Sequence, residues 1–317
     1  MSKPARAVLS VSVVLVAALG GLAAPASAAE PAPVPLGVDE CAVDVNDQGV
    51  VVTDTHLVDR GRVLPLPGGL TSAAAVNDRG QVAGLVDGRA AFWDGRRLHL
   101  IGVADPADTF ETVSAVSNRG EVVGTSGTFG GERHAWRWRQ GVLTPLAGLD
   151  GSTGANDVND HGQVVGDAWS GDTQHAVLWQ PDGTLVPLAT LGDGTGSSLA
   201  SAIDVHGRAA GYSYTSASTG DMRAVRWATP TSVRDVSPAG HAFGIVADLN
   251  DRGVAVGSIL PPGAPQHGFV QDSAGRVRLV APPDGAAALV LSAVNEVGLA
   301  AGCVIDDDGV HAITWRG

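Results

Sequence analysis

The sequence predicts an all-β protein, a closed seven-bladed β-propeller of four-stranded antiparallel blades, and two observations carry this prediction. The first is a five-residue turn pattern that recurs seven times along the chain. Each copy ends in a glycine: Gly49, Gly80, Gly120, Gly162, Gly207, Gly253 and Gly298. The second is the spacing of these glycines, which runs from 31 to 46 residues. A period of this length, built from strands, is typical of propeller blades.

The residue types explain each turn. The residue three before the glycine is Asn, Ser or Asp in all copies, and such side chains bond the backbone two residues ahead. The glycine allows the positive φ that a type I turn with a bulge requires. A second glycine follows four residues later in six copies, which predicts a close neighbour inside the second strand. These are Gly84, Gly124, Gly166, Gly211, Gly257 and Gly302.

Two further strands complete each repeat. The third follows patterns such as His134-Ala135-Trp136-Arg137-Trp138, and the fourth is short and often contains proline, as in Leu143-Thr144-Pro145-Leu146. Proline suits an outer edge strand. The tryptophans that end the third strand are expected to pack between repeats. An open β-solenoid is the alternative architecture.

The third-strand pattern, together with the Val-Asn-Asp-x-Gly turns, resembles the HAF-repeat family of bacterial extracellular proteins. The resemblance covers residues 34–317. The family is named after His-Ala-Phe, and here the phenylalanine position holds Trp136, Val177, Val225 or Ile313. The resemblance implies an extracellular location and a repeat architecture, and it implies no established chemistry.

Composition limits the function classes. The chain has 317 residues, of which 43 are glycine, 44% are hydrophobic and 17% are charged. This profile suits short strands joined by tight turns and argues against disorder. The formal net charge of −13 repels phosphate backbones and anionic membranes. We therefore expect no nucleic-acid partner and no membrane partner after signal cleavage, and we expect a monomer.

Residues 1–28 have the pattern of a signal peptide. A basic start precedes an apolar stretch, and Ala26-Ser27-Ala28 is a small-x-small cleavage site. A transmembrane anchor is the alternative, but the stretch is barely long enough to span a bilayer. We therefore expect a secreted, extracellular protein with a short linker over 29–33 and one repeat domain over 34–317.

The chain ends are expected to meet. The last repeat lacks a fourth strand, and residues 34–37 match the fourth-strand pattern. They are expected to pair with the strand around Ile313, which removes an exposed edge. Cys41 and Cys303 lie in the first and last repeats, so a disulfide between them is expected to lock the ring in an oxidising compartment. Two unrelated buried thiols are the alternative.

No catalytic motif is recognisable, because Gly-x-Ser-x-Gly, His-Glu-x-x-His and Cys-x-x-Cys are all missing. The sequence favours a non-enzymatic binding or scaffold module; the alternative is an extracellular polysaccharide hydrolase or lyase on a propeller. Aromatic residues among small polar ones, in the loops between second and third strands, suit stacking on sugars or peptides. Phe129, Trp169, Tyr212 and Tyr214 are therefore the candidate residues for binding an extracellular glycan or protein.

Metal sites are weaker candidates, and no cofactor is predicted. The histidines that open the third strand lie in different repeats, so they are expected to bond local backbone rather than share an ion. They are His134, His175, His267 and His311. Three turns of the form Asp-x-Asn-Asp resemble the start of a calcium loop but lack its downstream glutamate. Asp306, Asp307 and Asp308 form a separate candidate for Ca²⁺.

Overall fold

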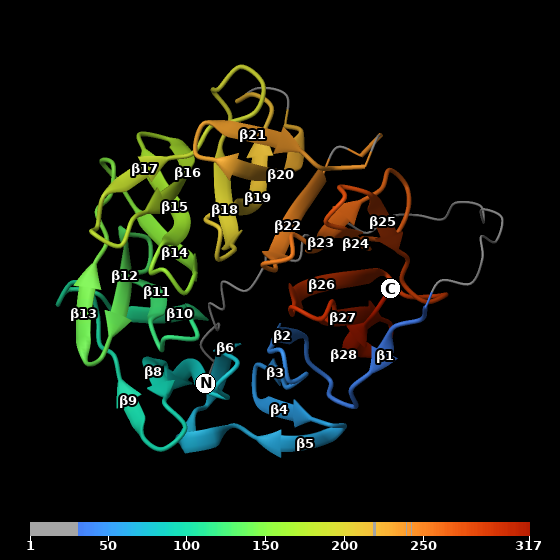
Figure 1. Ribbon diagram of the computed structural model, residues 1–317, viewed down its shortest axis with the longest axis horizontal. Helices are drawn as coiled ribbons and strands as arrows, with labels where there is room; N and C mark the ends of the chain where they lie inside the picture. The colour runs from blue at the N-terminus through green and yellow to red at the C-terminus, as the bar shows by residue number, and fades with distance from the viewer. Residues whose placement is uncertain (1–30, 218–219, 239, 242) are drawn as a thin grey trace.

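The computed structural model describes residues 31–217, 220–238, 240–241 and 243–317 (Figure 1). The signal peptide predicted over residues 1–28 lies outside the described residues. Within them the chain folds into β-strands and a single short 3₁₀ helix, η1 (Pro67–Gly69). The all-β prediction is therefore confirmed.

Repeats 1–6 each contribute four strands that pair with antiparallel neighbours, and repeat 7 contributes three. Repeat 1 contains β2 (Ala42–Val45), β3 (Val51–Thr53), β4 (His56–Asp59) and β5 (Arg62–Pro65). Repeat 2 contains β6 (Ser72–Val76), β7 (Val82–Val86), β8 (Arg89–Trp93) and β9 (Leu98–Leu100). Repeat 3 contains β10 (Phe110–Val116), β11 (Val122–Gly127), β12 (Arg133–Arg139) and β13 (Val142–Pro145). Repeat 4 contains β14 (Thr153–Val158), β15 (Val164–Ser170), β16 (Thr173–Trp179) and β17 (Leu185–Pro187).

The remaining repeats follow the same plan. Repeat 5 contains β18 (Ser198–Ile203), β19 (Ala209–Tyr214), β20 (Met222–Thr229) and β21 (Ser232–Asp235). Repeat 6 contains β22 (Phe243–Leu249), β23 (Ala255–Leu260), β24 (His267–Gln271) and β25 (Val277–Val280). Repeat 7 contains β26 (Ala288–Val294), β27 (Ala300–Asp306) and β28 (Gly309–Trp315), and it is completed by β1 (Val34–Pro35).

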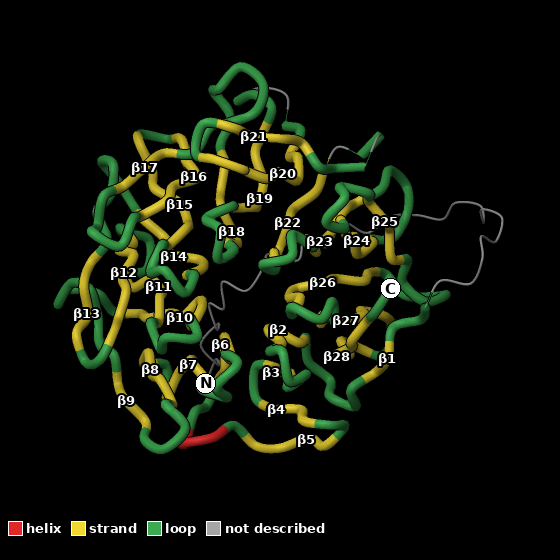
Figure 2. The backbone as a smooth tube through the Cα atoms, viewed as in Figure 1, coloured by secondary structure: helices red, strands yellow, loops and turns green. Residues whose placement is uncertain are grey.

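The sheets stand around a common centre, with the first strand of each repeat innermost and the fourth outermost (Figure 1). Figure 2 shows the strands of each repeat following one another from the centre to the rim, where β5, β13 and β21 lie. Repeats 5 and 6 form one eight-stranded sheet because a single parallel pairing, Met222 with Phe243, joins β20 to β22. The first and last described strands, β1 and β28, lie side by side.

The turns between first and second strands have the predicted chemistry. In repeat 1 the Gly49 N–H donates to the Asn46 carbonyl at 2.9 Å. The side-chain oxygen of Asn46 accepts from the N–H groups of Gln48 at 3.1 Å and Val50 at 2.9 Å. The turn glycine has φ between +69° and +82° in all seven copies, a region that favours glycine.

The second glycines have the close neighbour that the sequence predicts, and it is a backbone carbonyl. A Cβ added at Gly84 would lie 2.0 Å from the Ser72 oxygen, and one at Gly166 would lie 1.9 Å from the Gly154 oxygen. The first strand of each repeat shifts register beside this glycine, as between Ala73 and Ala75. Such a bulge pushes the chain toward its partner strand, so a side chain cannot fit there.

Hydrogen bonds between turns link successive repeats around the centre. The side-chain amide of Asn46 donates to the Asn77 carbonyl at 3.0 Å, and that of Asn77 donates to the Ser117 carbonyl at 2.9 Å. The same bond joins repeat 7 to repeat 1, from Asn295 to the Asn46 carbonyl at 2.9 Å. The turn asparagines therefore hold neighbouring repeats together as well as shaping their own turns.

Apolar side chains pack between neighbouring sheets. Trp179 and Trp227 are buried at the ends of their strands. Their indole N–H groups donate to the carbonyls of Ala147 at 2.7 Å and Ala189 at 2.6 Å, in the connections before their repeats. This confirms the prediction that these tryptophans pack between repeats, although Trp93 is only partly buried.

The chain ends pair as predicted from the missing fourth strand. Val34 lies opposite Thr314, and Pro35 lies opposite Ile313, in an antiparallel pair of β1 with β28. The Leu36 N–H extends this contact by donating to the Ala312 carbonyl at 2.9 Å. The last sheet thus has its four strands from the two ends of the repeat region.

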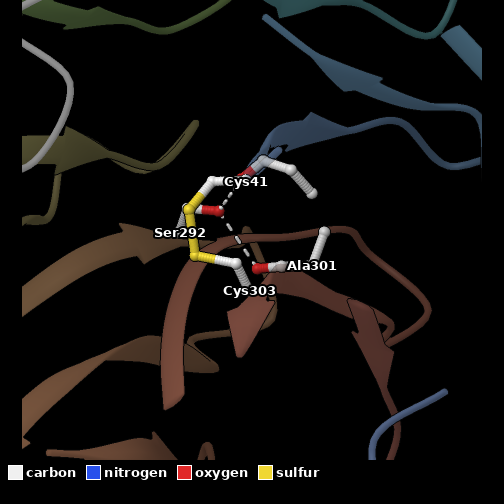
Figure 3. The surroundings of a disulfide bond; sticks show 5 residues. Cys41, Ser292, Ala301 and Cys303 are labelled. Atoms are coloured by element: carbon white, nitrogen blue, oxygen red, sulfur yellow. Dashed lines mark hydrogen bonds between the residues drawn. A yellow bond between two sulfur atoms is a disulfide. The ribbon is translucent and has the colours of Figure 1, made fainter. Parts of the chain in front are cut away.

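The predicted disulfide is present next to this pair. Cys41, just before β2, is bonded to Cys303 in β27, with a Cα–Cα distance of 4.8 Å (Figure 3). The Ser292 hydroxyl beside it donates to the Ala42 carbonyl at 2.6 Å and lies 3.1 Å from the Ala301 carbonyl. One covalent bond and one hydrogen bond therefore join repeat 1 to repeat 7 at the same place.

Candidate functional site

Three of the four predicted binding residues lie close to one another at the ends of second strands. Trp169 ends β15 in repeat 4, and Tyr212 and Tyr214 end β19 in repeat 5; all three are half-buried. Phe129 lies in the loop after β11 in repeat 3 and is 72% exposed. Its ring packs on Phe110, with centroids 5.3 Å apart. These positions share the face opposite the Asn–Gly turns, because the strands alternate in direction.

A buried carboxylate organises this face. The Asp167 side chain in β15 is almost fully buried. It accepts a hydrogen bond from the Trp169 indole N–H at 3.2 Å and pairs with the Arg133 guanidinium, in β12 of repeat 3, at 3.3 Å. Asp167 thus fixes the tryptophan ring and ties two repeats together.

A second hydrogen bond fixes the neighbouring tyrosine. The Tyr212 hydroxyl donates to the side-chain oxygen of Gln174 at 2.9 Å. Gln174 lies opposite Trp169 in the pairing of β16 with β15. The Tyr214 ring stands edge-on to the Tyr212 ring, with centroids 5.9 Å apart. We call the surface formed by Trp169, Tyr212 and Tyr214, over Asp167, Gln174 and Arg133, the aromatic surface.

Burial alters the acidity of two groups in the aromatic surface. Burial raises the pKa of Asp167, against hydrogen bonds from Gln174, Trp169 and Arg133. Burial also raises the pKa of Tyr212 to about 12, with the nearby charge of Asp167 adding to the effect. The phenol therefore stays protonated at neutral pH and presents an aromatic face and a hydrogen-bond donor.

Arg133, Asp167 and Gln174 were not predicted from the sequence. Asp167 directly follows the second-strand glycine Gly166, where other repeats carry Leu85, Thr125 or Ser258. A charged residue at a position that is otherwise uncharged was the available signal. Arg133 and Gln174 occupy variable positions at strand ends, so only the folded chain shows that they meet Asp167.

The histidine interpretation holds for one residue and is wrong for two. The His267 Nδ1 lies 2.9 Å from the Pro265 carbonyl, as expected of an imidazole bonding local backbone. The His134 Nδ1 instead lies 2.9 Å from the carboxylate of Asp108. The His311 ring bridges Asp39 and Asp306, each at 3.2 Å. The loops before the first strands bring Asp108 and Asp39 to the histidines, which the sequence spacing does not reveal, whereas Asp306 ends β27 in the same hairpin as His311.

Of the residues proposed for calcium, Asp306 and the turn aspartates make other contacts. Asp306 accepts from the backbone N–H groups of Asp308 and Gly309 at the tip of the last hairpin, and it also bonds His311. The turn aspartates accept from backbone N–H groups of the adjacent repeat, as Asp47 does from Glu296 at 2.8 Å. In the described part of the chain no group of three or more His, Cys, Asp or Glu side chains is arranged to hold a metal ion.

A second group of acids converges at the centre of the ring. Asp44, Asp157 and Asp248 precede the turns of repeats 1, 4 and 6, where the other repeats carry alanine. Each carboxylate bridges two repeats: Asp44 accepts from the backbone N–H groups of Val45 at 2.7 Å and Val76 at 2.8 Å. Asp157 and Asp248 make the equivalent pair of bonds.

These central carboxyls have strongly altered acidity. Burial raises the pKa of Asp44 and of Asp157 to about 7, and repulsion from Asp248 adds to both. The pKa of Asp248 is also raised, through burial. Repeats 1, 4 and 6 are not adjacent, so this mutual repulsion acts across the centre. Each oxygen already accepts a backbone N–H, which assigns the group a structural role between repeats.

Stability is therefore expected to fall as the pH rises from 5 to 8. An acid whose pKa is higher in the folded chain contributes stability below its unfolded value, about 4, and loses it as the pH approaches 7. We expect a loss of about 1–2 kcal/mol per group, allowing for the partial exposure of these side chains. The measurement is urea unfolding of the protein across this pH range.

Asp44→Ala and Asp157→Ala provide the matched variants, since alanine occupies this position in four other repeats. Each substitution should reduce the fall in the free energy of unfolding between pH 5 and 8, even if it lowers stability at pH 5. His311 gives a pH dependence of the same sign and is present in both variants. Burial lowers its pKa, but the hydrogen bonds and charges of Asp39 and Asp306 outweigh that effect, so the pKa of His311 is raised. If neither substitution changed how the free energy of unfolding varies with pH, the raised pKa values assigned to Asp44 and Asp157 would be wrong.

No family model matches the chain, and neither does any curated protein. Among solved structures it is similar to a streptogramin B lyase, with a TM-score of 0.56 and 8% identity over 90% of this chain and 97% of that one. A virginiamycin B lyase from Staphylococcus aureus gives a TM-score of 0.53 and 8% identity over 89% and 97%. A putative TolB from Agrobacterium tumefaciens gives 0.51 and 13% over 81% and 94%. These likenesses show a β-propeller fold.

Proposed function

We propose that this protein is a secreted binding module, built on a closed seven-bladed propeller, whose aromatic surface binds an extracellular glycan or peptide. The observation that carries the proposal is the pair of hydrogen bonds that fix the aromatic rings. Trp169 is held by Asp167, and Tyr212 is held by Gln174. Rings held in advance lose little conformational freedom on binding, so stacking contacts yield more net affinity.

The closed ring is inferred because the junction of repeats 7 and 1 has the same contacts as other junctions that carry the turn asparagine. Asn295 donates to repeat 1 as Asn46 donates to repeat 2. Apolar side chains of repeats 1 and 7 share one core, in which Val45 and Val51 pack with Ala293 and Ala301. A junction with the same hydrogen bond and packing as the others supports seven equivalent blades. The repeat pattern also supports kinship with the HAF-repeat proteins.

Secretion is supported by the disulfide and by the signal pattern of residues 1–28. Disulfides persist in oxidising compartments such as the cell exterior. The Cys41–Cys303 bond links the first and last repeats, where it would close the ring after export. None of the helices in the described part of the chain has the length and apolar character needed to span a bilayer.

The chemistry of the aromatic surface fits sugars or peptides. Half-buried aromatic rings offer flat apolar faces, while the polar groups beneath them can orient a ligand. The Tyr212 hydroxyl remains a donor because its pKa is about 12. The exposed Phe129 and Phe110 pair in repeat 3 lies on the same face and could extend the surface for a longer ligand.

A glycan and peptide array probed with the secreted protein tests this proposal. Any ligand found should bind at least about fivefold more weakly to Trp169→Ala and to Tyr212→Ala, because one stacking contact is worth about 1–3 kcal/mol. Leu100→Ala removes an exposed apolar side chain from repeat 2 and should bind normally. If neither aromatic substitution weakens binding of a ligand, that ligand binds elsewhere on the protein.

A polysaccharide hydrolase or lyase is the alternative function. It is favoured by the convergence of Asp44, Asp157 and Asp248 at the centre, where burial also raises the pKa of Asp44 and Asp157 to about 7, close to the operating pH of a general acid. Release of reducing ends or unsaturated products from an array-positive polysaccharide, lost in Asp157→Ala, would establish it. Binding without such products would support the binding module.

A further inference from the structure

Repeat 3 departs from its neighbours just after the turn glycine. Repeats 2 and 4 carry Gln81 and Gln163 at this position, and repeat 3 carries Glu121. In repeats 2 and 4 the glutamine side-chain oxygen accepts from the amide of the turn asparagine, from Asn77 at 2.8 Å and from Asn159 at 2.9 Å. A carboxylate at this position would be satisfied by the same donor.

That donor is missing in repeat 3. The turn residue is Ser117, and its hydroxyl oxygen accepts from the backbone N–H groups of Arg119 and Glu121, both at 3.3 Å. The carboxylate of Glu121 therefore accepts no hydrogen bond from any described residue, although the residue is only 5% exposed. Among the described residues the buried side-chain atoms without a partner are Trp136 Nε1 and Ser258 Oγ, so the Glu121 oxygens are open to the solvent and to the donors of a ligand.

The oxygens of Glu121 face an open cleft between repeats 3 and 4. The cleft has a volume of about 430 Å³ and is lined by Glu121, Arg137, Arg139, His161 and other residues. A Cβ added at Gly162, across the cleft, would lie 3.3 Å from one carboxylate oxygen and 3.9 Å from the other. The volume lies within the range of small-molecule sites, about 300–1,000 Å³.

Two arginines give the cleft its charge. The Arg137 guanidinium lies 3.9 Å from the Glu121 carboxylate and also donates to the Pro181 carbonyl at 2.7 Å. Arg139 is exposed and makes no ion pair with any described residue. It occupies the place of Asp94 and Gln180, whose oxygens accept from the glutamine amides in repeats 2 and 4. The acceptor is the backbone carbonyl of Asp94 in repeat 2 and the side-chain oxygen of Gln180 in repeat 4, so both ends of the contact are changed only relative to repeat 4.

We propose that this cleft binds a sugar acid, a ligand that carries one carboxylate beside several hydroxyl groups. Arg137 already offsets the charge of Glu121, so Glu121 needs hydrogen-bond donors rather than a cation, and hydroxyl groups supply them. Arg139 is a cation without a partner, and a ligand carboxylate supplies its counter-charge in paired geometry. One acid and two arginines also make the cleft locally positive on a chain of net charge −13.

The probe is glucuronate, titrated calorimetrically into the secreted protein at low ionic strength. Glucose has the hydroxyls without the carboxylate, and acetate has the carboxylate without the hydroxyls. Each should bind at least about tenfold more weakly than glucuronate, the change expected when one charge-assisted hydrogen bond is lost. Equal affinity for acetate would overturn the role of Glu121, and equal affinity for glucose would overturn that of Arg139.

Ser117→Asn is the decisive variant, because it restores the donor that repeats 2 and 4 use. It should weaken glucuronate binding at least about tenfold while thermal stability is kept or raised. Arg139→Gln should weaken binding by a similar factor, and Arg79→Gln, an exposed arginine outside the cleft, should not. Leu100→Ala, at an exposed residue outside both the cleft and the aromatic surface, should also leave glucuronate binding unchanged. No saturable binding, or full binding in Ser117→Asn, would overturn the proposal.

Discussion

Replacing both Cys41 and Cys303 by alanine is expected to lower the free energy of unfolding by about 3–5 kcal/mol. The disulfide joins residues 262 positions apart, and cross-linking so long a loop removes much entropy from the unfolded chain. Chain-entropy arguments place the upper bound at about 5 kcal/mol. Urea unfolding of the double variant, compared with the oxidised protein, measures the difference.

Reduction of the unaltered protein provides the control for this experiment. It should reproduce the stability of the double variant, because Cys303 is fully buried and alanine leaves most of its packing in place. Intact mass of the secreted protein should show the loss of two hydrogens. A destabilisation below about 1 kcal/mol would mean that contacts such as the Asn295–Asn46 hydrogen bond hold the junction unaided.

Gly84→Ala is expected to destabilise the protein by about 3 kcal/mol or more. The added Cβ would lie 2.0 Å from the Ser72 carbonyl oxygen and 2.8 Å from the Ala73 Cα. Both are backbone atoms of the paired strand, so the clash can be relieved only by moving the strand that lines the centre of the ring. Urea unfolding, with circular dichroism as the readout, measures this cost.

Gly88→Ala, in the same hairpin, separates this clash from glycine's conformational freedom. Gly88 has φ of +83° and no atom within 4 Å of an added Cβ. Its replacement should cost only about 1 kcal/mol, the penalty of a positive φ. Equal effects of the two substitutions would mean that strand β6 yields easily and that the second glycines are kept for another reason.

Much of the fold was accessible from sequence because its signals are local. An asparagine that bonds its own turn and a glycine with positive φ act within five residues, so their recurrence marks each repeat directly. The pairing of residues 34–37 with the last strand followed from counting strands. Three of the predicted binding residues, Trp169, Tyr212 and Tyr214, do lie together on one face.

The arrangement of polar partners could not be obtained in the same way. His134 opens its strand like His267, yet it bonds Asp108, which lies 26 residues earlier in a loop. Asp44 and Asp157 are 113 residues apart in a chain whose numbering gives no hint that they repel each other across the centre. Such contacts depend on how the repeats are placed around the ring.

The sequence by itself determined the repeat: where each turn forms, which positions must lack a side chain, and which strand was missing from the last repeat. Only the tertiary structure decided what the repeats do to one another. It placed Arg133, Asp167 and Gln174 beneath the aromatic surface, and it left Glu121 facing a cleft without a donor. The reason is physical: turn chemistry acts over a few bonds, whereas burial and charge interactions depend on distance in space.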